Sequence, residues 1–322
     1  MLEDGYCRRF SYLRLSITDV CNFRCVYCLP DGYQCETDRE FLTLKEIANT
    51  ISAFAGLGTT KVRLTGGEPS LRRDLPDIIA LAATTSGISQ VAITTNGFKL
   101  PQLVDQWSAA GLTSLNVSID SLDPRQFHAI TGQDKLHTIL DGVYKALGLG
   151  LKTKVNAVLL KPCGEGQLKN FLHWLKDTPV TLRLIELMQT GDNLSFFKLN
   201  HVSALPIKMQ LLQQGWVQVL RDKTSGPAEE FSHPDYAGRI GLIMPYHSGF
   251  CDSCNRLRVS AVGKLHLCLF AEQGMDLRPV LSTGSIADIQ QHLIGLMPQK
   301  KISHQLESGL TGATQHFSML GG

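Results

Sequence analysis

The feature that most limits how this chain can fold is a regular alternation of two kinds of segment. Between residues 12 and 188, short runs rich in β-branched residues alternate with longer amphipathic stretches. Strands are predicted at Tyr12–Thr18, Lys61–Thr65, Gln90–Thr95, Ser114–Ile119, Thr153–Leu160 and Leu182–Met188. Helices are predicted at Leu44–Ala55, Leu75–Thr84, Leu100–Ala110, Leu136–Leu147 and Gly166–Lys176. Units of about 30 residues imply right-handed βαβ crossovers and a parallel sheet.

The number of units favours a partial barrel. Six strand–helix units are too few for the eight of a closed (β/α)8 barrel, and a partial (β/α)6 barrel of the TIM type fits the count. Periodicity alone leaves an open, doubly wound α/β sheet possible. After residue 188 the segment 189–247 looks irregular, with strands expected at Trp216–Leu220 and Arg239–Met244. We therefore place a domain boundary near 190, with a barrel over 1–190 and a C-terminal region over 191–322.

Three closely spaced cysteines follow the first predicted strand. Cys21, Cys25 and Cys28 form a C-x3-C-x2-C run. Thiolates at this spacing suit three corners of a [4Fe–4S] cluster and leave the fourth iron open for a reactive ligand. The alternative is a zinc knuckle, or a redox trio with a distant fourth ligand, because structural zinc sites are closed by four protein ligands.

A second set of three cysteines lies towards the C-terminus, at Cys251, Cys254 and Cys268. A second cluster with an open iron is one interpretation, and a zinc site completed by His266 is the other. Arg256 and Arg258 lie between these cysteines and point the same way if the segment is extended. Guanidinium groups suit phosphate oxygens, so the pair is a candidate phosphate contact.

Charge and composition narrow the possible partners. A net charge of +2 gives no general reason to expect nucleic acid, so any anion site must come from local placement of Arg and Lys. No apolar run is long enough to span a membrane. The acidic start of the chain has no signal-peptide pattern, which favours a cytoplasmic protein. Nine cysteines without a secretion signal indicate metal or redox chemistry.

Two motifs together resemble those of the radical S-adenosylmethionine (SAM) enzymes. The run Thr18–Cys28 is similar to the cluster motif of that family, in which Tyr27 precedes the last cysteine. The segment Thr65–Pro69, with its Gly-Gly-Glu-Pro sequence, resembles the one that receives the amino group of SAM. The resemblance implies that SAM chelates the open iron. It also implies that one electron cleaves SAM to methionine and a 5′-deoxyadenosyl radical.

The C-terminal motifs narrow the resemblance. The C-x2-C-N-R-x-R run at Cys251–Arg258, a third cysteine at Cys268 and the terminal Gly-Gly resemble the molybdenum cofactor biosynthesis protein A family, the GTP 3′,8-cyclases. The resemblance covers essentially the whole chain and implies a partial barrel with two [4Fe–4S] clusters. The implied reaction converts GTP to (8S)-3′,8-cyclo-7,8-dihydroguanosine 5′-triphosphate, the first step of molybdenum cofactor (molybdopterin) biosynthesis.

The family's functional residues carry over to matching positions of this sequence. The implied cluster ligands are Cys21, Cys25 and Cys28 for the first cluster, and Cys251, Cys254 and Cys268 for the second. The implied SAM contacts are Tyr27, Gly67, Ser118 and Met188. The implied GTP contacts are Arg14, Arg63, Thr94, Lys154, Arg256, Leu257 and Arg258. Arg14 is also a candidate proton donor or electrostatic aid, although its high pKa makes it a poor acid. Gly321 and Gly322 are expected to enter the active site, since glycine has no Cβ to clash.

The resemblance also implies partners. They are GTP, an external one-electron reductant and a downstream cyclic pyranopterin monophosphate synthase of the protein C type, and a homodimer is left open. Two other functions stay open on the residues alone. One is another radical SAM enzyme with an auxiliary cluster, such as a peptide maturase, whose tail usually carries more cysteines. The other is a non-catalytic zinc or electron-transfer protein, which would have no use for a SAM site.

Overall fold

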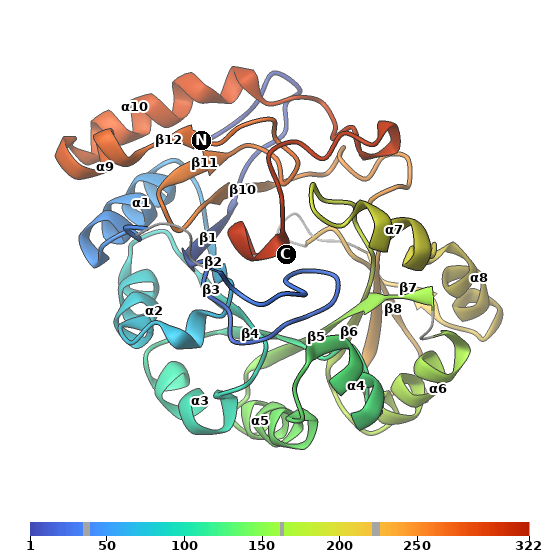
Figure 1. Ribbon diagram of the computed structural model, residues 1–322. Coiled ribbons are helices and arrows are strands. Elements are labelled where there is room, and N and C mark those ends of the chain that lie inside the picture. The colour runs from blue at the N-terminus through green and yellow to red at the C-terminus, as the bar shows by residue number, and fades with distance from the viewer. Residues whose placement is uncertain (35–38, 162–163, 221–225, 322) are drawn as a thin grey trace.

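A single curved sheet dominates the structure, a computed structural model that describes the chain except residues 35–38, 162–163, 221–225 and 322 (Figure 1). Its middle strands run parallel in chain order. They are β1 (Tyr12–Thr18), β2 (Lys61–Gly66), β3 (Gln90–Thr95), β4 (Ser114–Ser118), β5 (Lys152–Leu159) and β6 (Thr181–Glu186). The six predicted strands and their parallel order are confirmed.

Helices wrap the outer face of this sheet, as Figure 1 shows. Those predicted are α1 (Leu44–Gly56), α2 (Leu75–Thr84), α3 (Leu100–Ala109), α5 (Leu136–Gly148) and α6 (Gly164–Leu175). The first begins where Thr43 and Glu46 form a capping box, and it buries Ile47, Ile51 and Phe54 against the sheet. Because one face of the sheet carries helices and the other faces a cavity, the sheet is a partial barrel and not a doubly wound sheet.

The C-terminal part of the chain extends the sheet at both edges. Strand β10 (Arg256–Val259) pairs in parallel with β1, and β9 (Arg239–Ile243) pairs in parallel with β6. Antiparallel strands continue outward, with β8 (Glu229–Ser232) and β7 (Val217–Gln218) on one side and β11 (Lys264–His266) and β12 (Met275–Asp276) on the other. The barrel with a C-terminal extension is confirmed. The boundary near residue 190 stays a prediction.

In the described part of the chain up to residue 247, three α-helices were not predicted. They are α4 (Pro124–Thr131), α7 (Leu194–Asn200) and α8 (Leu205–Gln213). The last two fall in 189–247, so the expectation of an irregular segment is wrong there. Their apolar pattern is weak because α7 buries no residue and α8 buries Leu211 alone. The strand expected at Trp216–Leu220 is short, since Trp216 packs against the rings of His233 and Tyr236 instead.

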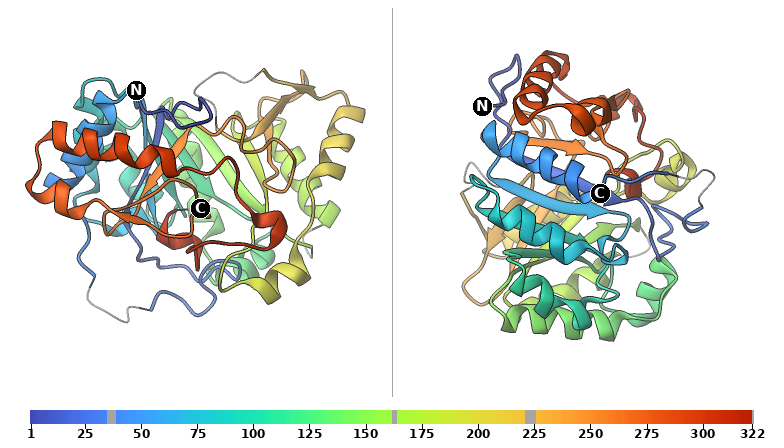
Figure 2. Two further views of the ribbon diagram at one scale, coloured as in Figure 1. Left: turned by 90° about the horizontal axis from the view of Figure 1, so that it is seen from above. Right: turned by 90° about the vertical axis from the view of Figure 1, so that its left-hand side faces the viewer.

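The chain ends inside the barrel. After α9 (Arg278–Thr283) and α10 (Ile286–Leu296), which pack beside α1, the chain runs through short turns at Met297–Gln299 and Leu306–Ser308. The last turn, η5 (Phe317–Met319), lies within the ring of strands in Figure 1, and Figure 2 shows the same segment from above and from the side. Among the described residues, no helix has the length and apolar character needed to cross a membrane.

Candidate functional site

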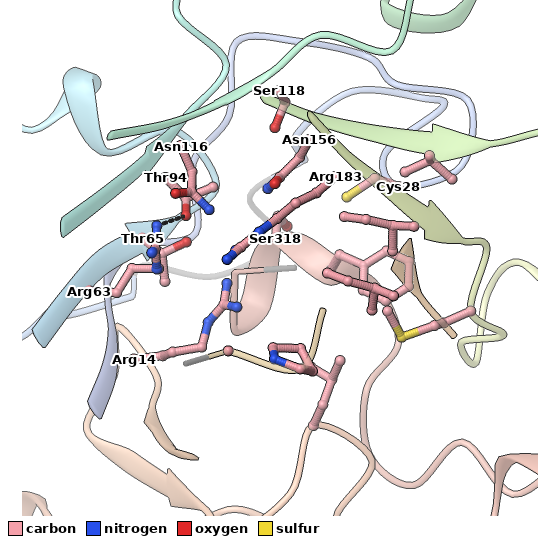
Figure 3. Close-up of a pocket in the computed structure, with 18 of the residues that line it drawn as sticks. Arg14, Cys28, Arg63, Thr65, Thr94, Asn116, Ser118, Asn156, Arg183 and Ser318 are labelled. Carbon is pink, nitrogen blue, oxygen red and sulfur yellow. Dashed lines mark hydrogen bonds between the residues drawn. The ribbon is translucent and has the colours of Figure 1, made fainter. Parts of the chain in front are cut away.

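One cavity inside the barrel reaches both sets of cysteines. Side chains from all six middle strands line it, together with residues 250–270 and the C-terminal turn. Since alternate residues of a strand face the same side, each strand contributes residues two positions apart, such as Asn116 and Ser118 on β4. Figure 3 shows Arg14, Arg63 and Arg183 on one side of this cavity, with Ser118 and Cys28 across from them.

The first wall of the cavity carries Cys21, Cys25 and Cys28, which are free thiols in the loop after β1. Burial raises the pKa of the Cys21 thiol to about 11 and that of Cys28 to about 12. The thiols also raise one another's pKa, as the effect of Cys21 on Cys28 shows. Three neighbouring thiolates would repel one another, and bound iron would offset that repulsion when it replaces the thiol protons. The three cysteines therefore fit the ligand set of an iron–sulfur cluster.

The Gly66-Gly67 segment packs tightly against this cysteine loop. A Cβ on Gly67 would lie 2.3 Å from the carbonyl oxygen of Val20, and Gly66 has a φ of +144°. Only glycine fits both constraints. The following Glu68 is buried and accepts hydrogen bonds from the Thr95 hydroxyl (2.7 Å) and the Asn96 backbone N–H (2.6 Å). The segment is therefore held rigidly beside the first cysteines.

The predicted SAM contacts all line the cavity. They are Tyr27, Gly67, Ser118 and Met188. A residue with no predicted role joins them, because the Tyr27 hydroxyl donates a 2.9 Å hydrogen bond to Asp120, whose other oxygen accepts from the Val158 N–H at 2.9 Å. Burial raises the pKa of Asp120 to about 6. Through Tyr27, Asp120 therefore ties the cysteine loop to the segment that follows β4.

The second set of cysteines lies in a more positive environment. Cys251, Cys254 and Cys268 line the same cavity. Burial raises the pKa of Cys254, but the charges of Arg256 and Lys300 outweigh it and lower the pKa to about 7. His266 lies on β11 opposite Arg258 and is not among the described residues that line the cavity. A shared zinc site with His266 therefore has no support in this geometry.

Three arginines from distant parts of the sequence lie side by side on neighbouring strands. In the sheet register, Arg14 on β1 is the partner of Arg258 on β10 and of Arg63 on β2. The three side chains face the cavity, where burial and the charges of neighbouring arginines lower the pKa of Arg14 to about 9. Such crowding of buried cations favours an anionic ligand.

Further cations that the sequence did not indicate line the same end of the cavity. Lys61 lies two residues before Arg63, and Arg183 projects from β6. The Nε atoms of Arg183, Arg256 and Arg258 are buried without a hydrogen-bond partner among the described residues. These donors could serve phosphate oxygens. We call this end of the cavity, lined by Arg14, Lys61, Arg63, Arg183, Arg256 and Arg258, the cationic end.

The remaining predicted GTP contacts differ in position. Thr94 lines the cavity and accepts a 3.1 Å hydrogen bond from Arg63, which Figure 3 draws as a dashed line. Lys154 is not among the described lining residues, and its Nζ bonds the carboxylate of Glu230 at 2.8 Å. The Leu257 side chain is buried in the hydrophobic core between two inward-facing arginines. Any contact that it makes with a ligand in the cavity must therefore use its backbone.

The C-terminal tail reaches the cavity. Arg14 donates a 2.7 Å hydrogen bond to the carbonyl oxygen of Gly321. Gly321 has a φ of +66°, and a Cβ there would lie 2.1 Å from the Thr65 hydroxyl. Phe317 and Ser318 line the cavity beside Cys28. The predicted Gly322 lies outside the described residues.

Comparison with known proteins places this arrangement in a class. Residues 15–175 match the model of the radical SAM superfamily, and residues 180–306 match the model described as Molybdenum Cofactor Synthesis C. Among solved structures, Streptococcus suis SuiB bound to S-adenosylmethionine superposes with a TM-score of 0.60 over 88% of this chain and 68% of that chain. At 13% identity this likeness shows the fold alone. The chain is a radical SAM protein, a class that uses a [4Fe–4S] cluster and SAM.

Two curated relatives narrow the class to one family. The chain is 55% identical over 324 residues to the GTP 3′,8-cyclase of Tolumonas auensis, covering 100% of this chain and 96% of that protein. It is also 55% identical over 325 residues to the GTP 3′,8-cyclase of Pectobacterium atrosepticum, covering 100% and 99%. The chain therefore belongs to the GTP 3′,8-cyclase family of molybdenum cofactor biosynthesis.

Proposed function

We propose that this chain converts GTP to its 3′,8-cyclised isomer, with SAM and GTP held in the one cavity. The observation that carries the proposal is the placement of the two sets of three cysteines and the cationic end around a single cavity. A triphosphate carries several negative charges near neutrality, which the cationic end can balance. The relatives that share this chain's full length carry the corresponding name.

The residues that would hold the cofactors are the two sets of three cysteines that line the cavity. In this proposal Cys21, Cys25 and Cys28 hold the first [4Fe–4S] cluster, and Cys251, Cys254 and Cys268 hold a second. When bound, the first cluster and SAM supply the one-electron chemistry that removes the C3′ hydrogen of GTP. The chain's own task is to place C3′ and C8 of the nucleotide within reach of each other.

The protein residues act by binding and by excluding water. Arg14, Arg63 and Arg258 hold the phosphates from three neighbouring strands, so the nucleotide is fixed along the cavity. In this proposal the tail shields the bound nucleotide from solvent, with Gly321 held by Arg14. A closed site protects a carbon-centred radical from water and other hydrogen donors. We keep Arg14 as an electrostatic aid, because even its lowered pKa of about 9 makes it a weak acid.

The partners and location follow from the same proposal. An external one-electron reductant would supply the electron that the cleavage of SAM consumes. A cyclic pyranopterin monophosphate synthase of the protein C type would take the product in the cytoplasm. These remain proposals, as does a homodimer.

Anaerobic turnover tests the proposed function directly. The protein is reconstituted with iron and sulfide and incubated with SAM, dithionite and GTP. We expect 5′-deoxyadenosine together with a cyclised isomer of GTP, separated by chromatography and identified by mass and NMR. The proposed function fails if SAM is cleaved but GTP is recovered unchanged over many turnovers.

Loss of one arginine of the cationic end should weaken GTP binding without loss of iron. For Arg258→Ala we expect GTP affinity to fall roughly ten- to a hundredfold, because a charge-assisted hydrogen bond contributes about 1.5–3 kcal/mol. Equilibrium dialysis on reconstituted protein measures the change. Arg239→Ala is the matched control, since Arg239 is an exposed arginine on β9. Equal affinities in the two variants would place the phosphates elsewhere.

The pH dependence of GTP binding should depend on Tyr12. Burial raises the pKa of this phenol, but the charges of Arg63, Arg14 and Lys61 outweigh it and lower the pKa to about 7. Its hydroxyl accepts a hydrogen bond from Arg63. Above pH 7 the phenolate adds a negative charge beside the cationic end, so GTP affinity should fall as pH rises from 6 to 8.

Tyr12→Phe provides the control for this pH effect. The γ-phosphate of GTP also titrates in this range, but its contribution is the same in both proteins. We expect the ratio of the two dissociation constants, wild type to variant, to rise with pH. A constant ratio from pH 6 to 8 would show that Tyr12 stays protonated.

A further inference from the structure

The carboxylate of Glu230 lies against the cationic end and has no part in the function proposed above. Glu230 Oε1 is 2.8 Å from Lys154 Nζ and 3.4 Å from Arg183 Nη2. The three side chains are only 10–26% exposed, so water screens these ion pairs less than it would at a surface. The charges of Lys154 and Arg183 lower the pKa of Glu230 despite the opposing effect of its burial, so the carboxylate is ionised at neutral pH.

The sheet register explains how Glu230 reaches these two cations. Glu230 on β8 pairs with Gly241 on β9, and Gly241 pairs with Arg183 on β6. Because Gly241 has no side chain, nothing stands between the carboxylate and the arginine on the strand beyond. A Cβ at Gly241 would lie 3.4 Å from Arg183 Cγ and 3.5 Å from Glu230 Cγ. The glycine on β9 therefore leaves room for Glu230, from the C-terminal region, to pair with cations on β5 and β6 of the barrel.

The consequence concerns Lys154. Lys154 is on β5 in register with the inward-facing Asn116 of β4, and Asn156 two residues later lines the cavity. Alternation would thus direct the lysine inward. The lysine is instead bonded to Glu230 and is absent from the described cavity lining. Glu230 therefore pairs with Lys154, a cation that would otherwise face the phosphates. It also pairs with Arg183, which lines the cavity and can contact the phosphates as well.

We propose that Glu230 is a specificity-determining residue that competes with the substrate's phosphates for Lys154 and Arg183. The inference rests on the proposed function, since it takes the cationic end as the phosphate site. An internal carboxylate lowers the affinity for every phosphorylated guanosine, and it does so most for the ligand whose phosphates reach these two cations. The side chain thereby sets how strongly the site discriminates by phosphate number.

The test compares two adjacent glutamates. Glu229 is one residue away, and its carboxylate pairs with Lys208 on α8, so Glu229→Gln removes the same charge from a different ion pair. Binding of GTP, GDP and guanosine is measured by equilibrium dialysis on reconstituted protein without SAM. We expect Glu230→Gln to bind GTP roughly three- to tenfold more tightly, GDP with a smaller gain and guanosine unchanged. Glu229→Gln should match the wild type.

Two further variants test whether the gain in GTP affinity comes from loss of the Glu230 charge and from the freed Lys154. Glu230→Ala removes the whole side chain and should shift GTP affinity in the same direction as Glu230→Gln. Adding Lys154→Met to Glu230→Gln should remove most of the gain, because the freed lysine provides it. The proposal is overturned if Glu230→Gln leaves GTP binding unchanged or weakens it, or if Glu229→Gln gives the same gain. A wild-type protein that binds no GTP would overturn the proposed function itself.

Discussion

Cys25→Ser should abolish SAM cleavage, whereas Cys254→Ser should leave dithionite-driven SAM cleavage intact and stop cyclisation of GTP. We expect this division because the two cysteine trios lie on separate walls of one cavity. Replacing one ligand removes the cluster on its own wall and leaves the other wall complete. The measurements are 5′-deoxyadenosine and cyclised nucleotide, by chromatography, on anaerobically reconstituted variants.

Iron content checks that each variant loses one cluster. The wild type should hold about eight irons per chain and each variant about four, as two cubane clusters require. Cys7→Ser is the control, since Cys7 is an exposed free cysteine outside the cavity lining described here. A Cys254→Ser protein that cyclised GTP at the wild-type rate would show that the second trio has no part in the reaction.

The tail gives the second large effect. Gly321→Ala should stop ring formation, because its Cβ would lie 2.1 Å from the Thr65 hydroxyl and the φ of +66° is strained for alanine. The tail could then no longer reach its seat beside Arg14. We expect clusters, fold and most of the GTP affinity to persist, so the loss should appear in the turnover rate.

A second glycine in the C-terminal segment distinguishes the effect of backbone strain from the effect of displacing Gly321 from its position beside Arg14. Gly309 has a φ of +74°, and a Cβ there would meet nothing within 4 Å. Gly309→Ala therefore imposes similar strain without a clash, and it should retain cyclisation. If Gly321→Ala cyclised GTP as fast as Gly309→Ala, the described position of the tail would be irrelevant to the reaction.

The fold was predictable where one face of each element is buried. Strand β5 and helix α1 appear close to the predicted residues, since alternation and capping signals are local. The helices α7 and α8 gave no such signal because they bury almost nothing. The addition of β9 and β10 to opposite edges of the sheet depends on contacts far apart in sequence, which no local pattern records.

The sequence motifs predicted most of the residues of the site, but the prediction was incomplete. The cysteines and arginines of the motifs lie around one cavity, while Lys61, Tyr12 and Asp120 had no predicted role. Each of these is two residues from a predicted site residue on the same strand or at its end, so strand periodicity could have indicated them. No such signal marks Glu230, because its action depends on the glycine opposite it on β9.

The most direct test of the central claim follows one hydrogen atom. The claim is that this cavity places C3′ of GTP where the SAM-derived radical can reach it. GTP carrying deuterium at C3′ is incubated anaerobically with SAM, dithionite and the reconstituted protein, and 5′-deoxyadenosine is analysed by mass spectrometry. We predict one deuterium in 5′-deoxyadenosine and none remaining at C3′ of the cyclised nucleotide. 5′-Deoxyadenosine without deuterium, formed while the labelled GTP keeps its own, would contradict the account.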